Sequence, residues 1–485
     1  MRHGAASGPR ARIRVRDNRA AWPFWVLAAW LVIVFAAGGS ARADIQSLLF
    51  LQPLAFIVLG AGLCSIHCCH LRVRATVFAL AAALILLMAM QLVPLPPALW
   101  RSLPGRDLPG AIDDAVALGA TWRPLTMTPQ ATREALWSLV NPLAVLLLGA
   151  QLGAREQARL VGLLLAMGLA SGFLALVQIS GPDTGPAFLY RITNNGSAVG
   201  LFANRNHQAV FLAMLIPLAL AWRRLASDGR RVAAHRQWLE WLPAAVYLLF
   251  IVPLVLVTGS RSGTIVAAAA LLVAPALFWK LDDTGRTSGR GSAKPTGPGR
   301  ARLVAGFAAV LTICALAAVL GRALSFERFF AQPVLDDMRV RILPTVYTMI
   351  EGFFPVGAGF GSFPQVYQVY EPDALLMPTY MNHAHNDWLE LALEGGAPAV
   401  LLLASALIAL FAAGLRRSFA PGVDARRRLL ARLGAIALLQ LAIASLSDYP
   451  VRVPSLAAFA VLAMLWSTLP ADDRGRGHEN EGTYV

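Results

Sequence analysis

Long apolar segments recur along almost the whole chain, and they limit the folds that are open to it. Each window of about 18 or more apolar residues is long enough to cross roughly 30 Å of hydrocarbon as an α-helix. Charged residues make up only 14% of the chain, and its mean hydropathy of +0.59 lies outside the range of soluble proteins. We therefore expect an all-α, polytopic bundle of about 12 transmembrane helices. The expected helices follow the apolar segments at 22–40, 46–66, 75–93, 135–152, 158–180, 200–222, 241–258, 262–280, 303–321, 397–415, 430–447 and 454–470.

The pattern predicts one membrane domain with loops and tails rather than separable modules. Two outer loops are too long to be plain turns, one near 94–134 and a larger one at 321–396. Long loops in compact proteins are usually functional. The remaining expected divisions are a basic tail at 1–21, helices 1–9 within 22–320, helices 10–12 within 397–470 and a polar tail at 471–485.

Basic side chains orient the bundle. With the N-terminus inside, the inner segments collect most of the 42 Lys and Arg residues, as the positive-inside rule requires. We interpret the basic runs as topology signals beside anionic lipid and expect no nucleic acid as a partner. The runs are Arg2–Arg19, Arg223–Arg236, Arg286–Arg302 and Arg416–Arg432.

The N-terminal segment allows two interpretations. Basic residues, the apolar stretch Trp22–Ala37 and the small-residue string Ser40-Ala-Arg-Ala43 resemble a cleavable signal peptide. Retention as a first membrane helix is the interpretation we favour, and every later helix keeps its orientation in either case.

A cluster of Cys and His residues at Cys64–His70 has the composition of a zinc site. No second pair of ligands occurs in the inner loops, and cysteine is common in apolar helices. We therefore expect no metal.

Four arginines are expected at the outer face. Arg205 starts the sixth apolar segment, and Arg261, within Gly259-Ser-Arg-Ser-Gly263, lies between the seventh and the eighth. Arg339 and Arg341 lie in the large loop. Guanidinium groups bind phosphate oxygens bidentately and stay charged, so these side chains suit a lipid-linked diphosphate. Interfacial snorkelling of Arg205 and a solvated helix face for the loop pair are the structural alternatives.

The string Asn382-His-Ala-His-Asn-Asp387 supplies groups for acid–base chemistry just before the tenth helix. Histidine is the usual base near neutral pH, so His385 is the candidate that activates a sugar hydroxyl, with His383 nearby. Asn386 is a supporting candidate, and Glu390 either orients an imidazole or stabilises the first turn of the helix. Both histidines are alternatively plain interfacial polar residues.

These strings, in this order and topology, resemble the O-antigen ligase and polymerase superfamily of bacterial inner-membrane glycosyltransferases. The ligase-type signature is a His followed by Asn, Ser or Gln, nine residues and a Gly, which His385, Asn386 and Gly396 match. Ala399 departs from the Gly, Thr or Tyr expected three positions later. The other matching strings are Gln91-Leu-Val-Pro-Leu-Pro-Pro97, Gly200-Leu-Phe-Ala-Asn-Arg-Asn-His207, Thr258-Gly-Ser-Arg-Ser-Gly263 and Gly357-Ala-Gly-Phe-Gly-Ser-Phe363.

The resemblance implies a GT-C-like fold and a metal-independent, inverting enzyme without a cofactor, whose site faces the periplasm. Its donor would be a glycan on undecaprenyl diphosphate and its acceptor a saccharide or lipid A-core hydroxyl. The resemblance gives Arg205 and Arg261 diphosphate-binding roles, with His207 also in the substrate site, and gives His385 the activation of the acceptor. Polymerase, ligase and protein oligosaccharyltransferase all stay open, with a preference for an exopolysaccharide polymerase. A lipid-linked-glycan flippase is the alternative from another class.

Overall fold

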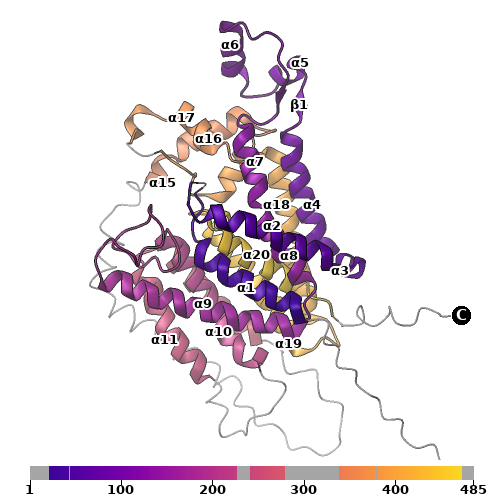
Figure 1. Ribbon diagram of the computed structural model, residues 1–485, viewed down its shortest axis with the longest axis vertical. Helices are drawn as coiled ribbons and strands as arrows, with labels where there is room; N and C mark the ends of the chain where they lie inside the picture. The colour runs from indigo at the N-terminus through magenta and orange to yellow at the C-terminus, as the bar shows by residue number, and fades with distance from the viewer. Residues whose placement is uncertain (1–20, 43, 227–240, 279–337, 378–379, 472–485) are drawn as a thin grey trace, which may run out of the picture.

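The computed structural model describes residues 21–42, 44–226, 241–278, 338–377 and 380–471 (Figure 1). Almost every element within them is an α-helix, and the apolar segments expected there are helical, but the fourth, 135–152, is divided between the end of one helix (Pro129–Ser138) and a second helix (Val140–Ala150). The ninth expected segment, 303–321, lies outside the described residues, as do residues 1–20 and 472–485 of the two tails. The all-α class is confirmed.

Five helical segments in the described part are long and apolar enough to cross a membrane. They are α2 (Leu48–Ser65), α9 (Ala154–Ser180), α10 (Arg205–Ala226), α12 (Arg261–Val273) with its extension η3 (Ala274–Phe278), and α18 (Asp387–Phe419). Four apolar helices are shorter: α1 (Ala21–Ala37), α4 (Ala75–Gln91), α11 (Leu242–Val257) and α20 (Pro454–Ser467). The total of twelve spans stays a prediction.

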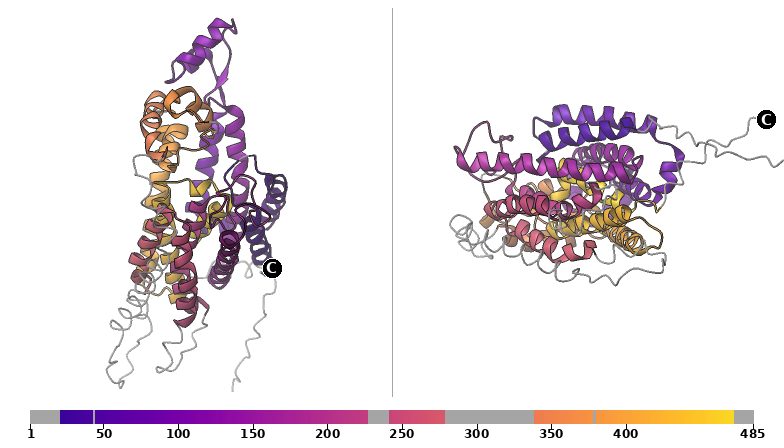
Figure 2. Two further views of the ribbon diagram at one scale, coloured as in Figure 1. Left: turned by 90° about the vertical axis from the view of Figure 1, so that its left-hand side faces the viewer. Right: turned by 90° about the horizontal axis from the view of Figure 1, so that it is seen from below.

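Helix α10 lies at the centre of the bundle. Nearly all of its residues are buried, as expected for a helix that is apolar on all sides. It packs against α9, α11, α12 and α19 (Ala425–Ala444). Figure 2 shows α1 and α2 along one side of the molecule and α11 and α12 along the other. The remaining short helices α3 (Cys68–Val73) and α8 (Val140–Ala150) lie near α4 and α2.

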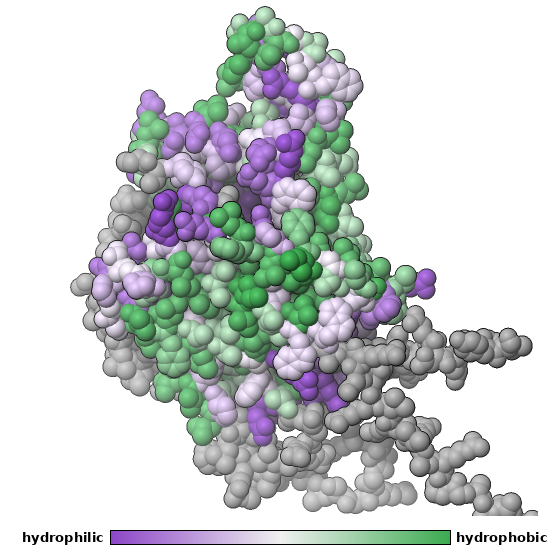
Figure 3. Space-filling view, viewed as in Figure 1, coloured by the Kyte–Doolittle hydropathy of each residue, from purple (hydrophilic) through white to green (hydrophobic). Residues whose placement is uncertain are grey.

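Two groups of short elements lie at one end of the bundle, and we call them the first and the second outer group. The first contains a two-stranded antiparallel pair, β1 (Pro94–Leu95) and β2 (Arg123–Pro124), with α5 (Pro97–Arg101), α6 (Asp107–Ala115) and α7 (Pro129–Ser138). The second contains α15 (Met338–Arg341), α16 (Leu343–Phe353), α17 (Phe363–Tyr370) and η5 (Asp373–Leu375). In Figure 3 hydrophobic side chains cover the middle of the molecule, and hydrophilic ones gather over α15–α17.

Helix α18 is broken at one residue. Gly396 has φ +59° and ψ −156°, a conformation open essentially to glycine alone. The segment Gly357-Ala-Gly-Phe-Gly361 packs against α18 at this break. Ala358 N donates a hydrogen bond to Leu393 O at 2.8 Å, and Gly359 N donates one to Glu394 O at 2.9 Å. The same segment contacts the first outer group, where Met127 N donates to Ala358 O at 2.7 Å. The glycine spacing seen in the sequence thus fixes both outer groups against α18.

We expect Gly396→Ala to destabilise the protein by about 1–3 kcal/mol or more, because a Cβ there would lie 2.1 Å from Pro355 O in addition to the strained φ. Gly60→Ala is the matched control, since nothing lies within 4 Å of a Cβ at that helical position. Thermal unfolding in detergent measures both variants. An unchanged midpoint for Gly396→Ala would contradict the described break.

Candidate active site

The histidine loop is fixed to the bundle by the N-cap of α18. Asn386 Oδ1 accepts hydrogen bonds from the backbone N atoms of Trp388 at 3.0 Å and Leu389 at 3.1 Å. Its Nδ2 donates to Leu446 O at 3.0 Å, in the connection between α19 and α20. His385 has φ +52°, an uncommon left-handed conformation that the surrounding contacts maintain. Asn386 therefore acts here as a cap that positions the preceding imidazole.

A wholly buried carboxylate, Asp448, lies at the centre of the cluster. Its Oδ1 is 3.4 Å from His385 Nδ1 and 3.7 Å from His207 Nε2. Its Oδ2 is 3.8 Å from Nη2 of Arg339, whose Nη1 donates to Ser447 O at 2.8 Å. Burial alone would raise the pKa of Asp448, but His207, His385 and Arg339 hold it well below its ordinary value. Asp448 is therefore an anion that faces two imidazoles.

Tyr449 contacts all three histidines of the site. Its ring centroid lies 4.2 Å from that of His383 and 5.0 Å from those of His207 and His385. Burial, together with the adjacent Asp448, raises the pKa of Tyr449 to about 12. The phenol therefore stays neutral at ordinary pH and packs the imidazoles against one another.

A second ionic cluster, centred on Arg452, stabilises the start of α18 that follows the histidine loop. Arg452, in the short helix η6 (Pro450–Arg452), lies 3.1 Å from Asp387, 3.2 Å from Glu390 and 3.1 Å from Glu394. Burial lowers the pKa of Arg452, but these carboxylates outweigh that effect and raise it above its ordinary value. Glu390 also lies 2.8 Å from His383 Nδ1 and accepts from Ala384 N at 2.8 Å. Glu390 thus orients His383, whereas Asp448 faces His385.

Arg205 and Arg261 begin two helices that pack closely together. The Ser260 side chain caps α12 by accepting from Gly263 N at 3.1 Å. A Cβ built on Gly263 would lie 2.2 Å from the Ala209 Cβ, and one on Gly259 would lie 3.7 Å from Nη1 of Arg205. The Arg205 guanidinium therefore lies beside the turn that carries Arg261. His207 lies two positions after Arg205, so the start of α10 carries both Arg205 and a member of the Asp448 cluster.

The helix ends add to the positive potential. Helices α10, α12 and α18 begin at Arg205, Arg261 and Asp387, so three sets of N-terminal amide groups lie at this end of the bundle. Such termini favour anions. The arrangement combines guanidinium groups, which as a class bind phosphate oxygens, with an imidazole–carboxylate pair, which as a class can transfer a proton.

The structure brings five of the expected residues into one cluster with Asp448 and Tyr449, namely His207, Arg339, His383, His385 and Glu390. Arg341, two positions after Arg339 on α15, is exposed and makes no hydrogen bond or ion pair with the described residues of the cluster. The structure therefore does not include Arg341 in the cluster. The sequence interpretation missed Asp448, Tyr449 and Arg452. The sequence does contain a signal for two of them, because Asp448 and Arg452 are charged residues between two apolar segments, as Arg261 is.

No group of three or more His, Cys, Asp or Glu side chains in the described part is arranged to hold a metal ion. Within Cys64–His70, the His70 Nδ1 accepts a hydrogen bond from His67 N at 3.2 Å, and Cys64 and Cys68 are exposed. This local bond gives the two histidines a structural use.

Comparison with known proteins agrees with the geometry. Residues 245–404 match the family model described as O-antigen ligase. The matched region contains Arg261, Arg339, His383, His385 and Glu390, whereas Arg205, His207 and Asp448 lie outside it. No curated protein matches the chain. The match covers about a third of the chain, and together with the apolar helices it supports a membrane protein with a role in polysaccharide ligation, similar over these residues to the O-antigen ligase family.

Proposed function

We propose that the protein transfers a glycan from undecaprenyl diphosphate to a hydroxyl of a saccharide acceptor, at the periplasmic face of the bacterial inner membrane. The observation that carries the proposal is that Arg205, the turn that carries Arg261 and the His385–Asp448 pair lie at the same end of the bundle, joined through His207 at the start of α10. The acceptor is another lipid-linked saccharide or lipid A-core.

Acceptor activation falls to His385. Its Nδ1 faces Asp448, which leaves Nε2 for the acceptor hydroxyl. His385 takes the hydroxyl proton as the acceptor oxygen attacks the anomeric carbon, and Asp448 stabilises the resulting imidazolium. Here Asp448 stays ionised throughout the step.

Departure of the donor lipid falls to the arginines. As the new glycosidic bond forms, the bond between the anomeric carbon and the diphosphate oxygen breaks, and undecaprenyl diphosphate leaves with the electron pair. Arg205 and Arg261 stabilise the charge that develops on the diphosphate. The proposal needs no metal, and a single displacement inverts the anomeric configuration.

We expect Arg261→Lys to lower glycan transfer by about 10²-fold or more, because an ammonium cannot reproduce the bidentate fork on a phosphate. Surface glycan is measured in a null strain that expresses the variant, with membrane abundance determined by immunoblot. Arg133→Lys, at an exposed position of α7, is the matched control. Normal glycan from the Arg261→Lys variant at equal abundance would remove Arg261 from the mechanism.

The null strain also identifies the acceptor. Single repeats on lipid A-core indicate a lost polymerase, and unattached lipid-linked chains indicate a lost ligase. Under-glycosylated protein with unchanged lipopolysaccharide would indicate a protein oligosaccharyltransferase instead, and a loss of outward lipid-linked glycan would indicate a flippase.

A further inference from the structure

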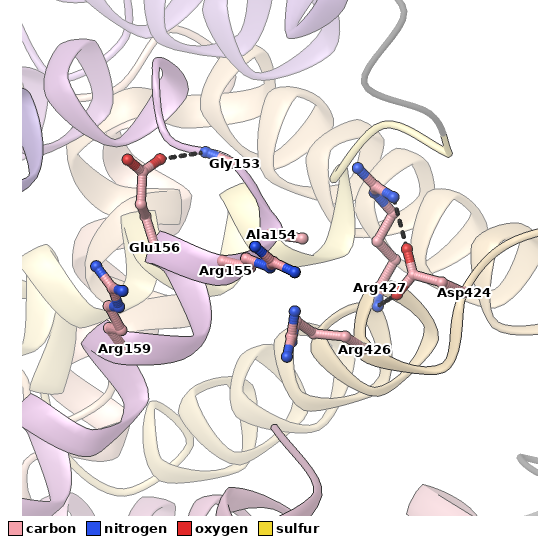
Figure 4. A pocket seen from close by; sticks show the side chains of 8 residues that line it. All are labelled: Gly153, Ala154, Arg155, Glu156, Arg159, Asp424, Arg426 and Arg427. Carbon is pink, nitrogen blue, oxygen red and sulfur yellow. Dashed lines mark hydrogen bonds and ion pairs between the residues drawn. The ribbon is translucent and has the colours of Figure 1, made fainter. Parts of the chain in front are cut away.

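A basic cleft lies at the end of the bundle opposite the candidate active site. It has a volume of about 500 Å³ and is lined by the first turns of α9 and α19 (Figure 4). Arg426 Nε donates to Leu225 O at 3.2 Å, near the last residue of α10, whereas Arg205 begins that helix. Because α10 has 22 residues, the cleft is about 30 Å from Arg205. It is therefore separate from the site described above.

The cleft has a positive balance of charge. Four arginines line it, together with two acids. Both acids cap helices: Glu156 accepts from Gly153 N at 2.8 Å, and Asp424 accepts from Arg427 N at 3.0 Å and pairs with the Arg427 guanidinium at 2.5 Å. Figure 4 shows the Arg155 and Arg426 guanidinium groups directed toward each other across the cleft. Two like charges that face each other in this way create a site for an anion between them. The arginines are Arg155, Arg159, Arg426 and Arg427.

The surroundings of the cleft place it at the depth of lipid headgroups. The Arg159 guanidinium lies 5.9 Å from the ring of Phe24. Next to Phe24, the Trp25 side chain is 65% exposed. Trp222 is also exposed, and it lies beside α9 at Gly162. Exposed tryptophans beside arginines are typical of the boundary between hydrocarbon and water. A soluble anion would not need this apolar border.

We propose that this cleft binds the phosphate headgroup of an anionic phospholipid, with Arg155 and Arg426 as the two principal ligands. The acyl chains lie along the apolar surface near Trp25. In the proposed orientation this is the cytoplasmic leaflet. The bound lipid bridges the start of α9 and the start of α19, two helices that run from this cleft to the other end of the bundle.

The test uses the full-length protein in detergent and native mass spectrometry with phosphatidylglycerol or phosphatidylcholine of identical acyl chains. The Arg155→Gln/Arg426→Gln variant should retain phosphatidylglycerol about tenfold or more weakly than the wild-type protein. The matched control is Arg72→Gln/Arg416→Gln, which removes two exposed charges that do not line the cleft. The control should retain the lipid as the wild-type protein does.

Arg155→Gln alone keeps the test decisive if the double variant does not fold, because Arg155 is exposed and makes no ion pair among the described residues. Equal losses in the cleft variant and the control would overturn the proposal in favour of general surface charge. Equal retention of phosphatidylcholine, or no loss in any variant, would also overturn it. Displacement of the lipid by millimolar inorganic phosphate would reassign the cleft to a soluble anion.

Discussion

Replacing His385 by asparagine is expected to lower the rate of glycan transfer by roughly 10²–10⁴-fold, the usual contribution of a general base. Asparagine is the informative substitution because it tolerates the left-handed backbone that His385 adopts at φ +52°. Its amide cannot take up a proton at neutral pH. The loss should therefore appear in the rate of transfer with little change in thermal stability.

Substitution of Asp448, which faces His385, tests the same prediction in a second way. Asp448→Asn removes the charge that stabilises the imidazolium, so it should slow transfer as well. Residues that act as a unit are not additive, so the His385→Asn/Asp448→Asn double variant should be little slower than His385→Asn alone. His67→Asn, at an exposed position of the Cys64–His70 cluster, is the matched control and should leave transfer unchanged. Independent, additive losses would show that Asp448 does not act through His385.

Replacing Arg452 by glutamine is expected to destabilise the protein by about 3–5 kcal/mol, because it leaves buried carboxylates without their cation. The side chains of Glu390 and Glu394 are 1% and 0% exposed, and both lie about 3 Å from Arg452. Thermal unfolding in detergent measures the loss. Arg101→Gln is the control, since it removes a surface ion pair with Asp114 and should leave the unfolding midpoint unchanged.

A compensating substitution separates this charge effect from lost packing. Glu394→Gln in the Arg452→Gln background removes one of the unpaired charges, so it should restore part of the lost stability. The same substitution in the wild-type protein should not stabilise it, because there Glu394 has its partner. If the double variant unfolds at a lower temperature than Arg452→Gln, the ionic account of this cluster is wrong.

Helix positions and the basic composition of the site could be predicted from the sequence because both depend on local pattern. The apolar segments are helical where the structure describes them, although 135–152 is divided between α7 and α8. The spacing from His385 to Gly396 matches the break in α18. The roles of Arg205 and Arg261 stay predictions, but the close packing of α10 on α12 agrees with them.

The pairing of Asp448 with His385 could not be predicted, because it depends on a contact between distant segments. Asp448 lies 63 positions after His385 in the chain, and only the fold brings its Oδ1 to 3.4 Å from His385 Nδ1. Glu390 was expected beside an imidazole from its place on the helix, and the structure pairs it with His383. Arg341 was expected with Arg339, but among the described residues only Arg339 of this pair contacts the Asp448 cluster, and Arg341 is exposed.

Reconstitution with a defined substrate tests the central claim most directly. The purified protein in liposomes receives a synthetic glycan on undecaprenyl diphosphate and a saccharide acceptor, and the lipid product and the new linkage are analysed by mass spectrometry and NMR. We predict one undecaprenyl diphosphate released per linkage formed, inversion at the anomeric carbon, and loss of both products in the Arg261→Lys and His385→Asn variants. A retained anomeric configuration, or undiminished transfer by these two variants, would contradict the proposed mechanism.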